Sequence, residues 1–297
     1  MQKWPWQNAS IACSCSSPMD PLIINLAPTG LVPTRDQTPH VPMTAEEVAV
    51  DCARCCAAGA SMLHLHARAA DGSPSCSREV FGELVAAVRR RAPDAIIVTT
   101  TSGRRASEVE LRGASLTLEG EQKPDMASLT LGSLNFSAEA SISAPETVMR
   151  LAALMKERGI RPELEVFDLG MVNFAKILID KGLIEPPFYF NILLGNPSSA
   201  QASLLHLGTL VADLPPQSVW SVAGIGRHQA AANALGVVVG HGVRTGLEDN
   251  LWFDDARTLL ATNLQLVERV AAQAAAIGRP LASPGQVRRR LGLAPRP

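Results

Sequence analysis

Short apolar runs rich in β-branched residues alternate along the chain with longer stretches that carry helical signals. Runs that are apolar on both faces and lead into a helix are typical of parallel strands buried between helices. Thr44 with Glu47 three residues later forms a capping box, and Pro145 stands at a favoured first helical position. The pattern predicts eight strands, at Leu22–Thr29, Ser61–Arg68, Ala95–Ser102, Met126–Phe136, Pro162–Leu169, Phe188–Gly195, Val219–Gly226 and Val243–Asn250.

Eight strand–helix units predict the α/β class and, within it, a closed (β/α)8 TIM barrel. A doubly wound open sheet is the alternative, but it favours a glycine-rich phosphate turn after the first strand, and Ala27–Gly30 lacks that pattern. No Gly-, Ser- or Pro-rich linker divides the chain, so we expect one catalytic domain over residues 21–297. Residues 1–20 lack the apolar stretch of a secretory signal, and we expect them to be a disordered extension.

Composition and charge exclude several classes of protein. The chain of 297 residues has 27 Lys and Arg against 28 Asp and Glu, which leaves no basic surplus to neutralise a nucleic-acid backbone. No apolar run approaches the roughly 20 residues that a membrane helix needs. The six cysteines lack the paired spacing of a structural zinc site and are expected to be reduced thiols. We therefore expect a soluble cytoplasmic protein that binds neither nucleic acid nor membrane.

His64 and His66 lie two residues apart in the second predicted strand. Side chains of a strand alternate between its faces, so both imidazoles share one face while Leu63 and Leu65 share the other. The leucine face suits packing under helices, which turns the imidazoles into the barrel near its C-terminal rim, where barrel enzymes keep their active sites. This arrangement is typical of metal ligands, and a pair of hydrogen-bonded core histidines is the alternative.

A third ligand is expected from the end of another strand. In the eighth predicted strand Arg244, Gly246 and Glu248 share one face, whereas Asp249 breaks the parity and is expected on the loop. Two imidazoles and the Glu248 carboxylate, with the fourth position open, are typical of a catalytic Zn²⁺ that polarises a carbonyl oxygen. Asp249 is the candidate base. A salt bridge at the rim is the alternative reading of these acidic residues and Arg244.

At these residues the sequence resembles the β-keto acid cleavage enzyme family, typified by the enzyme that cleaves 3-keto-5-aminohexanoate. The resemblance is collinear from about Pro21 to the tail at Gly278–Pro284, so it spans nearly the whole chain. The segments that carry it are Asn25–Gly30, Val41–Glu47, Leu63–Arg68, Asp71–Ser75, Leu131–Phe136, Glu165–Asp168, Val222–Arg227 and Arg244–Asn250.

The resemblance implies a zinc-dependent barrel, a homo-oligomer such as a tetramer, that takes a β-keto acid and acetyl-CoA and releases acetoacetate and a new acyl-CoA. Arg244 would orient the substrate carboxylate, because a guanidinium offers paired donors and keeps its charge. Carried over position by position, the family's metal ligands fall on His64, His66 and Glu248, its catalytic Arg and Asp on Arg244 and Asp249, and two pocket hydroxyls on Thr100 and Ser128.

Three positions depart from the family's pattern. Val32 stands where the aminohexanoate-cleaving member has a glutamate, and Thr130 stands where it has an asparagine. These two changes concern the substrate side chain, and the loss of an acid at Val32 favours neutral or anionic keto acids. The usual Gly-His order before the arginine is reversed in His241-Gly242, which concerns the packing beneath Arg244.

A glycine loop leaves the seventh predicted strand, with Gly224, Gly226 and Arg227 before a helix start. It could receive a CoA phosphate, since helix N-termini bind anions, and a tight turn with Arg227 in solvent is the alternative. Other functions stay open at this point. They are a metal-dependent lyase of the hydroxymethylglutaryl-CoA type, an amidohydrolase, for which His206 and His228 do not fall at strand ends, and a barrel that binds ligand without catalysis.

Overall fold

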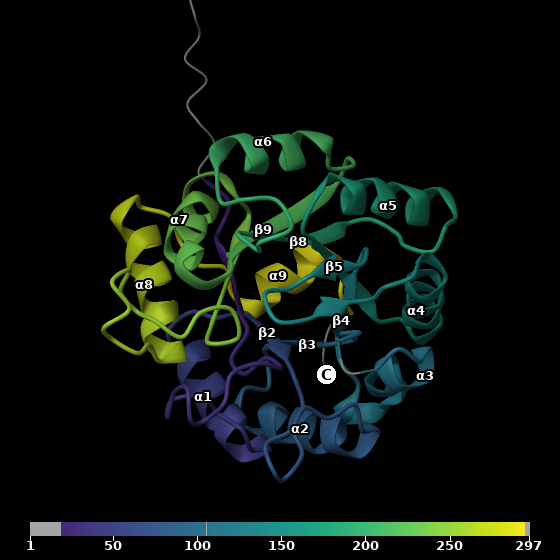
Figure 1. Cartoon of the computed structure of the whole chain (residues 1–297), viewed down its shortest axis with the longest axis horizontal. Coiled ribbons are helices and arrows are strands. Elements are labelled where there is room, and N and C mark those ends of the chain that lie inside the picture. The colour runs from purple at the N-terminus through teal and green to yellow at the C-terminus, as the bar shows by residue number, and fades with distance from the viewer. Residues whose placement is uncertain (1–18, 105, 295–297) are drawn as a thin grey trace, which may run out of the picture.

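Eight parallel strands form a closed barrel in the computed structural model, which describes residues 19–104 and 106–294 (Figure 1). The barrel closes because β1 pairs with β10, with Ile23 opposite Gly242 and Asn25 opposite Arg244. The predicted (β/α)8 barrel is confirmed, and the open-sheet alternative is wrong. In barrel order the strands are β1 Ile23–Leu26, β10 Gly242–Thr245, β9 Ser218–Gly224, β8 Phe188–Leu194, β7 Arg161–Val166, β4 Met126–Thr130, β3 Ile96–Thr99 and β2 Met62–Leu65.

Helices surround the barrel, and the two predicted helix starts are confirmed. Thr44 accepts a hydrogen bond from the Glu47 amide in a complete capping box, and Pro145 is the first residue of its helix. The helices are α1 Ala45–Ala57, α2 Arg78–Arg91, α3 Val109–Arg112, α4 Pro145–Arg158, α5 Leu169–Asp180, α6 Leu204–Asp213, α7 Gln229–Val239, α8 Asn263–Ala276 and α9 Pro284–Leu291, with short 3-10 turns at Ala114–Thr117, Gly120–Gln122 and Gly226–His228.

Most predicted strands extend too far toward their C-terminal ends. The largest error is the strand expected at Met126–Phe136, because β4 ends at Thr130 and the chain then forms a separate antiparallel hairpin of β5 (Leu134–Asn135) and β6 (Ala140–Ser141). Inward-pointing residues continue past the last ladder hydrogen bond, so the side-chain pattern outlasts the strand. These extra residues line the C-terminal mouth of the barrel.

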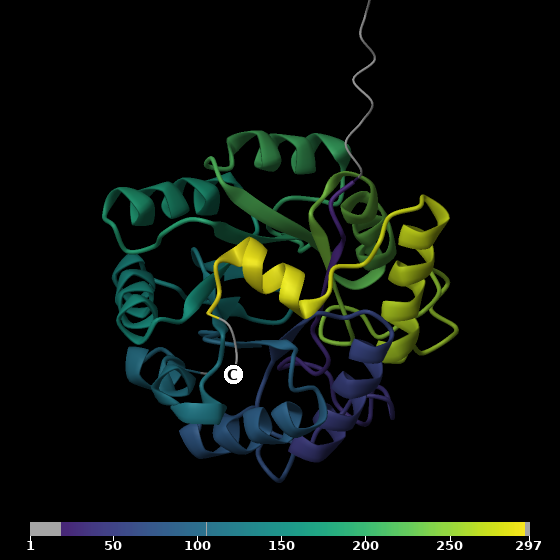
Figure 2. The ribbon, with the colours of Figure 1, turned by 180° about the vertical axis from the view of Figure 1, so that it is seen from behind.

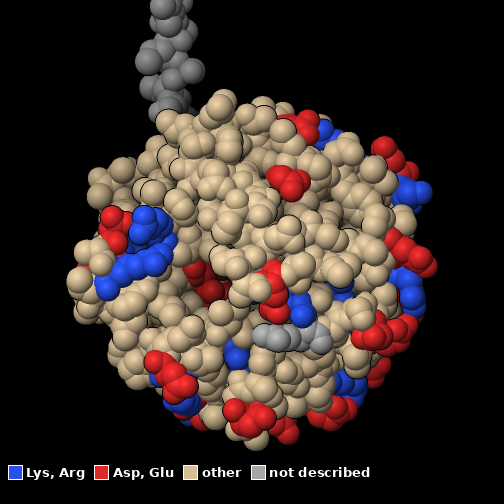
Figure 3. Space-filling model, viewed as in Figure 1, with Lys and Arg blue, Asp and Glu red and all other residues tan. Residues whose placement is uncertain are grey.

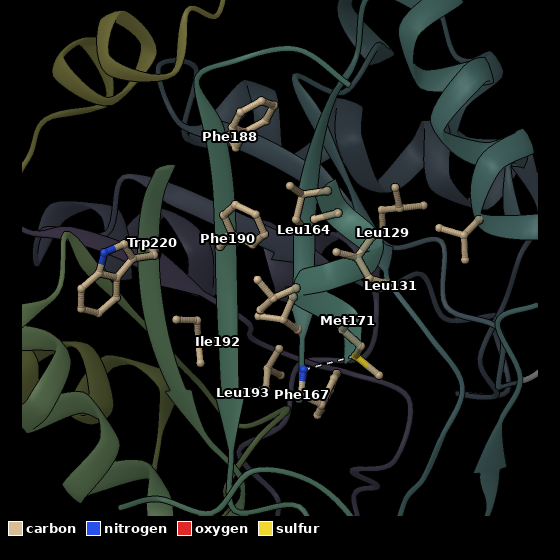
Figure 4. Packing of buried hydrophobic residues seen from close by; sticks show 14 of the residues in the cluster. Leu129, Leu131, Leu164, Phe167, Met171, Phe188, Phe190, Ile192, Leu193 and Trp220 are labelled. Atoms are coloured by element: carbon tan, nitrogen blue, oxygen red, sulfur yellow. Dashed lines mark hydrogen bonds between the residues drawn. The ribbon is translucent and has the colours of Figure 1, made fainter. Parts of the chain in front are cut away.

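The largest hydrophobic cluster lies between the barrel wall and the helices. Leu129, Leu164, Phe190 and Ile192 project from neighbouring strands and are fully buried (Figure 4). At one edge of this cluster the amide of Phe167 donates a hydrogen bond to Sδ of Met171 at 3.2 Å, which ties the end of β7 to α5. The outward faces of the strands are therefore apolar, as the parity of Leu63 and Leu65 predicts.

Helix α9 crosses the N-terminal end of the barrel and closes it from behind (Figure 2). Its Val287 and Leu291 pack with the lowest interior residues of the strands. Nearby, the Asp125 carboxylate receives hydrogen bonds from Arg89 of α2 at 2.5 Å, from Arg288 of α9 at 2.9 Å and from the Ile97 amide at 2.9 Å. This end of the barrel is sealed, so access to the interior is from the opposite end.

The expected disordered extension, residues 1–20, falls outside the described residues except for Met19 and Asp20. Asp20 contacts the barrel's closed end, where its carboxylate pairs with Arg290 and its carbonyl accepts from Arg279. Within the described residues no helix is both long enough and apolar enough to span a membrane. The four described cysteines, at positions 52, 55, 56 and 76, are free thiols.

Candidate active site

A pocket of about 340 Å³ opens at the C-terminal end of the barrel, between the loops that follow the strands. Its floor includes His66, Glu248 and Asp249, and its walls include Phe136 and Trp252. Figure 3, which views this end, shows acidic atoms recessed in a hollow near the middle of the face. The pocket therefore lies where barrel enzymes place their chemistry.

His64 and His66 both point into the barrel, as predicted. His64 is on β2 and is almost fully buried, whereas His66 comes directly after the strand and reaches the pocket floor. Their Nε2 atoms are 3.2 Å apart. Oε1 of Glu248 lies 3.2 Å from Nε2 of His66 and 3.9 Å from Nε2 of His64. Three potential ligand atoms thus face one point.

A turn brings Glu248 to this point, and not a position on the inward face of a strand. Strand β10 ends at Thr245, and Gly246 then takes a φ of +145°, so the expectation that Glu248 lies on a strand face is wrong. The turn is held by hydrogen bonds from the Asp249 and Asn250 amides to the Gly246 carbonyl. Both Glu248 and Asp249 therefore lie on the loop after β10.

The first loop of the barrel approaches Glu248 so closely that it needs a glycine. Gly30 has a φ of +65°, and a Cβ atom there would lie 2.5 Å from Cγ of Glu248. The Glu248 amide also donates to the carbonyl of Ala27, just after β1. The position of the Glu248 side chain is therefore fixed by the loop after the first strand.

Glu163 holds His64 in place from below. Its Oε2 lies 2.6 Å from Nδ1 of His64, and its Oε1 accepts from Asn25 at 2.5 Å and from Asn191 at 3.4 Å. The carboxylate has no exposed surface. A carboxylate on one ring nitrogen leaves the other, Nε2, directed at His66 and Glu248, and this is the usual support of a metal-bound histidine.

Arg244 connects the acids of the site. The guanidinium, 2% exposed, donates from Nε and Nη2 to both oxygens of Asp249 at 2.9 and 3.1 Å. Its Nη2 also contacts Oε1 of Glu248 at 2.6 Å, and its Nη1 contacts Oε1 of Glu165 at 3.3 Å. The geometry brings Arg244, Glu248 and Asp249 together, as the sequence predicts. It also directs the guanidinium at three carboxylates.

These charges shift the pKa values of the site residues in different directions. Burial raises the pKa of Asp249, against the effect of Arg244. Burial alone would also raise the pKa of Glu248, but Arg244 and the two histidines hold it well below its usual value. Burial lowers the pKa of His66, so its imidazole is neutral. A neutral imidazole beside an ionised carboxylate is the protonation state that a metal requires.

The remaining predicted residues are divided between the pocket and its surroundings. Thr100 and Val32 line the pocket, and Val32 is 53% exposed. Thr130 also lines it, and its hydroxyl donates to Glu165 at 2.7 Å. Ser128 is buried one layer lower, where its Oγ accepts from the Thr101 amide, and it does not line the pocket. The structure therefore places one of the two predicted hydroxyls, Thr100, within reach of a ligand.

Of the three residues predicted in the glycine loop after β9, only Gly226 lines the pocket. Its amide already donates to the Asp249 carbonyl at 2.7 Å. Gly224 ends β9 and packs against the backbone of His228, away from the pocket lining. Arg227 is exposed. The reversed His241-Gly242 pair lies at the opposite end of β10, where His241 accepts from the Trp220 amide and makes an edge-to-face contact with the Trp220 ring.

Sequence reasoning missed three residues of the site. Glu163 and Glu165 alternate with buried Leu164 and Val166 on β7, so they carry the same two-residue signal as the histidine pair. That signal was available and would have placed both acids inside the barrel. Arg104, which lines the pocket above Phe136, follows β3 on a loop and has no periodic signal of its own.

The donor set fits a divalent metal. Tetrahedral Zn²⁺ with ligands at about 2.1 Å places them about 3.4 Å apart, close to the spacings of the three atoms of His64, His66 and Glu248. A second group, His64 with Glu163 and Glu165, also has its atoms close together. It fits less well, because the His64 nitrogen on that side is already hydrogen-bonded to Glu163.

Comparisons with known proteins point to one enzyme family. A family model described as beta-keto acid cleavage enzyme matches residues 21–293. The 3-keto-5-aminohexanoate cleavage enzyme of Fusobacterium nucleatum is 38% identical over 276 residues, which cover 93% of this chain and 99% of that protein. The 3-oxoadipate:acetyl-CoA acetyltransferase of Cupriavidus necator is 37% identical over 92% of this chain and 95% of its own. A solved ternary complex of ObcA with a C4-CoA adduct and oxalate shares the fold, with a TM-score of 0.76 at 23% identity over 86% of this chain and 68% of that one.

Proposed function

The chain belongs to the β-keto acid cleavage enzyme family, and from this premise we propose that it condenses a β-keto acid with acetyl-CoA and releases acetoacetate and a new acyl-CoA. The observation that carries the proposal is the convergence of His64, His66 and Glu248 on one point at the floor of the pocket, beside Asp249 and Arg244. The name of the Cupriavidus necator relative pairs a keto acid with acetyl-CoA, which supports the same co-substrate here.

We propose zinc as the metal, held by His64, His66 and Glu248. When bound, zinc supplies a Lewis acid that polarises a ketone and stabilises the negative charge developing on its oxygen. Glu163 fixes the tautomer of His64 through Nδ1, and the raised pKa of His64, which Glu163 and Glu248 maintain against burial and Arg244, reflects the negative charge around it. A dication would neutralise this surplus of carboxylates.

In the proposed reaction Asp249 removes a proton from the carbon between the ketone and the carboxylate of the substrate. Burial raises the pKa of Asp249, which makes its carboxylate a better proton acceptor. Arg244 holds Asp249 by two hydrogen bonds and so sets the direction from which that carboxylate approaches. Arg244 also places a positive charge where the substrate carboxylate and the developing enolate lie.

The carbanion then attacks the thioester carbonyl of acetyl-CoA, which forms a carbon–carbon bond and expels the CoA thiolate. That thiolate adds to the former ketone carbon, and the bond between this carbon and the former carbanion carbon breaks. The electron pair stays with the acetoacetate fragment, which takes up the proton from Asp249. Thr100, which lines the pocket, is proposed to donate to a developing oxyanion, and Ser128 supports that wall through Thr101.

The CoA moiety is proposed to approach along the loop after β9. Exposed Arg227 is the residue of this loop that can pair with a phosphate, because the Gly226 amide is already bonded to Asp249. Gly226 contributes by leaving space at the pocket wall, and Gly224 by allowing the close approach of the His228 backbone. Arg227→Ala should raise KM for acetyl-CoA and leave KM for the keto acid unchanged.

Incubation of the purified protein with a panel of β-keto acids and acetyl-CoA, read by mass spectrometry, tests the proposal. Acetoacetate and the matching acyl-CoA are expected in equal amounts, and none without acetyl-CoA. The His64→Ala, His66→Ala double variant should lose metal and turnover together. Stoichiometric metal in that double variant would contradict the ligand assignment, and keto-acid cleavage without acetyl-CoA would indicate a lyase instead.

We also propose that the protein is a cytoplasmic homo-oligomer, such as a tetramer. In support, Leu204 and Leu205 of α6 and Val238 and Val239 of α7 are all more than half exposed. Apolar surface of this kind favours association. Light scattering coupled to gel filtration measures the state directly, and a monomer at micromolar concentration would contradict the proposal.

A further inference from the structure

Two cations that line the pocket are left unused by the proposed reaction: Arg257, which is exposed, and Arg104, which is partly buried. Arg104 lines the pocket, and its guanidinium carbon lies 3.3 Å from the centre of the Phe136 ring. Over residues 19–104 and 106–294, no side chain forms an ion pair or hydrogen bond with this guanidinium. Arg244, in contrast, is shared among three carboxylates. Arg104 and Arg244, the two pocket arginines that are buried or partly buried, are therefore in opposite electrostatic situations.

The Arg104 charge is only partly compensated. Burial lowers the pKa of Arg104, and Glu248, Glu165 and Glu139 oppose this through space without touching it. A guanidinium nevertheless keeps its charge at neutral pH, so a partly buried cation stands beside the pocket. The face of Phe136 offsets some of the lost hydration through the negative charge of its π system. A charge held in this way lacks the partner that buried charges normally have.

The neighbouring wall provides no alternative partner for a substrate tail of either charge. Val32 and its neighbours Leu31 and Pro33 are apolar and line the same pocket. Glu139 is the acid nearest in sequence to Phe136, and it already has a partner of its own. An ammonium group on this wall would meet Arg104 and lack a free acid. A carboxylate would meet the paired N–H donors of a guanidinium, whose planar shape matches it.

We propose that Arg104, seated on Phe136, binds an anionic group at the far end of the substrate, so that the preferred substrates are β-keto acids with a second, terminal carboxylate. This inference rests on the proposed function and names its substrate class. The keto-acid end lies at His66, Glu248 and Asp249, and the tail lies at Arg104. The same pocket rejects an amino-bearing tail.

Binding measured by calorimetry without acetyl-CoA tests this inference separately from catalysis. The probes are 3-oxoadipate and 3-oxohexanoate, which have the same carbon chain and differ in the terminal carboxylate. The wild type should bind the diacid about 10- to 100-fold more tightly, as expected for a charged hydrogen-bond pair. Arg104→Gln should remove most of this preference for the diacid. Arg104→Lys keeps the charge but lacks the paired donors of a guanidinium, so it should retain part of the preference.

Arg269→Gln is the matched control. Arg269 stacks on Phe253 at 4.9 Å, so it is also an arginine on an aromatic ring, but it does not line the active-site pocket. Its substitution should leave the diacid-to-monoacid ratio unchanged. The same four proteins are then compared by kcat/KM for both acids and by KM for acetyl-CoA.

Equal affinity for the two acids in the wild type, or tighter binding of an aminated keto acid, would overturn the inference. So would an Arg104→Gln defect confined to KM for acetyl-CoA, because the anion would then be a CoA phosphate. Diacid preference in binding without any acyl-CoA product supports the role of Arg104 and overturns the proposed function instead. Failure to bind either acid overturns both.

Discussion

Glu163→Gln removes one negative charge from a carboxylate with no exposed surface and keeps the size of the side chain. The wild-type carboxylate contacts Nδ1 of His64 at 2.6 Å and Nδ2 of Asn25 at 2.5 Å. His64 and Arg244 hold the pKa of Glu163 below its usual value although burial would raise it, so the group is ionised. The variant therefore replaces a charge-assisted hydrogen bond to His64 with a neutral one.

The expected magnitude follows from this exchange. A hydrogen bond to a charged group contributes about 1.5–3 kcal/mol and a neutral one about 0.5–1.5 kcal/mol, so the difference is about 1–2 kcal/mol. If that difference acts on the metal, its dissociation constant rises about 5- to 30-fold, within the range of about 10–100-fold known for carboxylates behind metal-bound histidines. The Gln oxygen still accepts from Nδ1 of His64, so the ligand geometry is retained.

Competition with a chromophoric chelator for Zn²⁺ measures this change, and Glu165→Gln is the control. Glu165 lies two residues further on β7 and contacts Arg244 and Thr130, with no hydrogen bond to either histidine. Loss of the Glu165 carboxylate charge should change the zinc affinity by less than about threefold. Unchanged zinc affinity in Glu163→Gln would refute the reasoning. Equal losses in both variants would place the metal among His64, Glu163 and Glu165 instead.

Asp249→Asn should lower kcat at least about 100-fold with metal content unchanged, because it removes the proposed base and keeps its shape; turnover near the wild-type level would assign the base elsewhere. Val32→Glu should raise kcat/KM for 3-keto-5-aminohexanoate, which the wild type should use at least about tenfold less well than an uncharged keto acid of similar length; equal use by the wild type would remove the role of Val32. Gly30→Ala should weaken zinc binding, since its methyl group would displace Glu248, and a wild-type zinc affinity would contradict the contact. Asp125, with a pKa lowered to about 2 by Arg288 and Arg89 against burial, stabilises the fold above its usual value of 3.8 and ceases to do so as the pH falls through about 2. Asp125→Asn should therefore lose about 2 kcal/mol in urea unfolding at pH 7 and flatten the pH dependence below pH 4, and an unchanged unfolding curve would contradict this.

The arrangement of the barrel could be predicted from the sequence because the continuous apolar runs of its strands differ clearly from the residue pattern of its helices. Ile96, Ile97 and Val98 are all buried, because both faces of their strand are covered. Such a strand needs no alternation of apolar and polar residues, and this produces the continuous apolar runs. Strand ends could not be predicted, since inward side chains continue into the loops at positions such as His66. The hairpin of β5 and β6 depends on a contact between Phe136 and Glu139 that periodicity does not encode.

The candidate site, like the fold, could be predicted from the sequence only in part. The histidine pair could be found from a two-residue spacing in an apolar strand, and Glu163 with Glu165 could have been found from it too. Glu248 lies beside the histidines as expected, but the turn at Gly246 brings it there and strand parity does not. Arg104 could not be found, since its proposed role depends on Phe136, a residue distant in sequence that only the folded chain brings beneath it.

The contact between Gly30 and Glu248 also constrains how the protein is made. The two histidines leave the ribosome early, whereas Glu248 belongs to the last strand–loop unit and is positioned by the loop after the first. Strand β10 can pair with β1 only when most of the chain has been synthesised, and pairing between distant segments is slow to form. On the proposed assignment, a nascent chain holds two of the three ligands without the acid. The complete set of proposed ligands therefore comes together only when the barrel has closed.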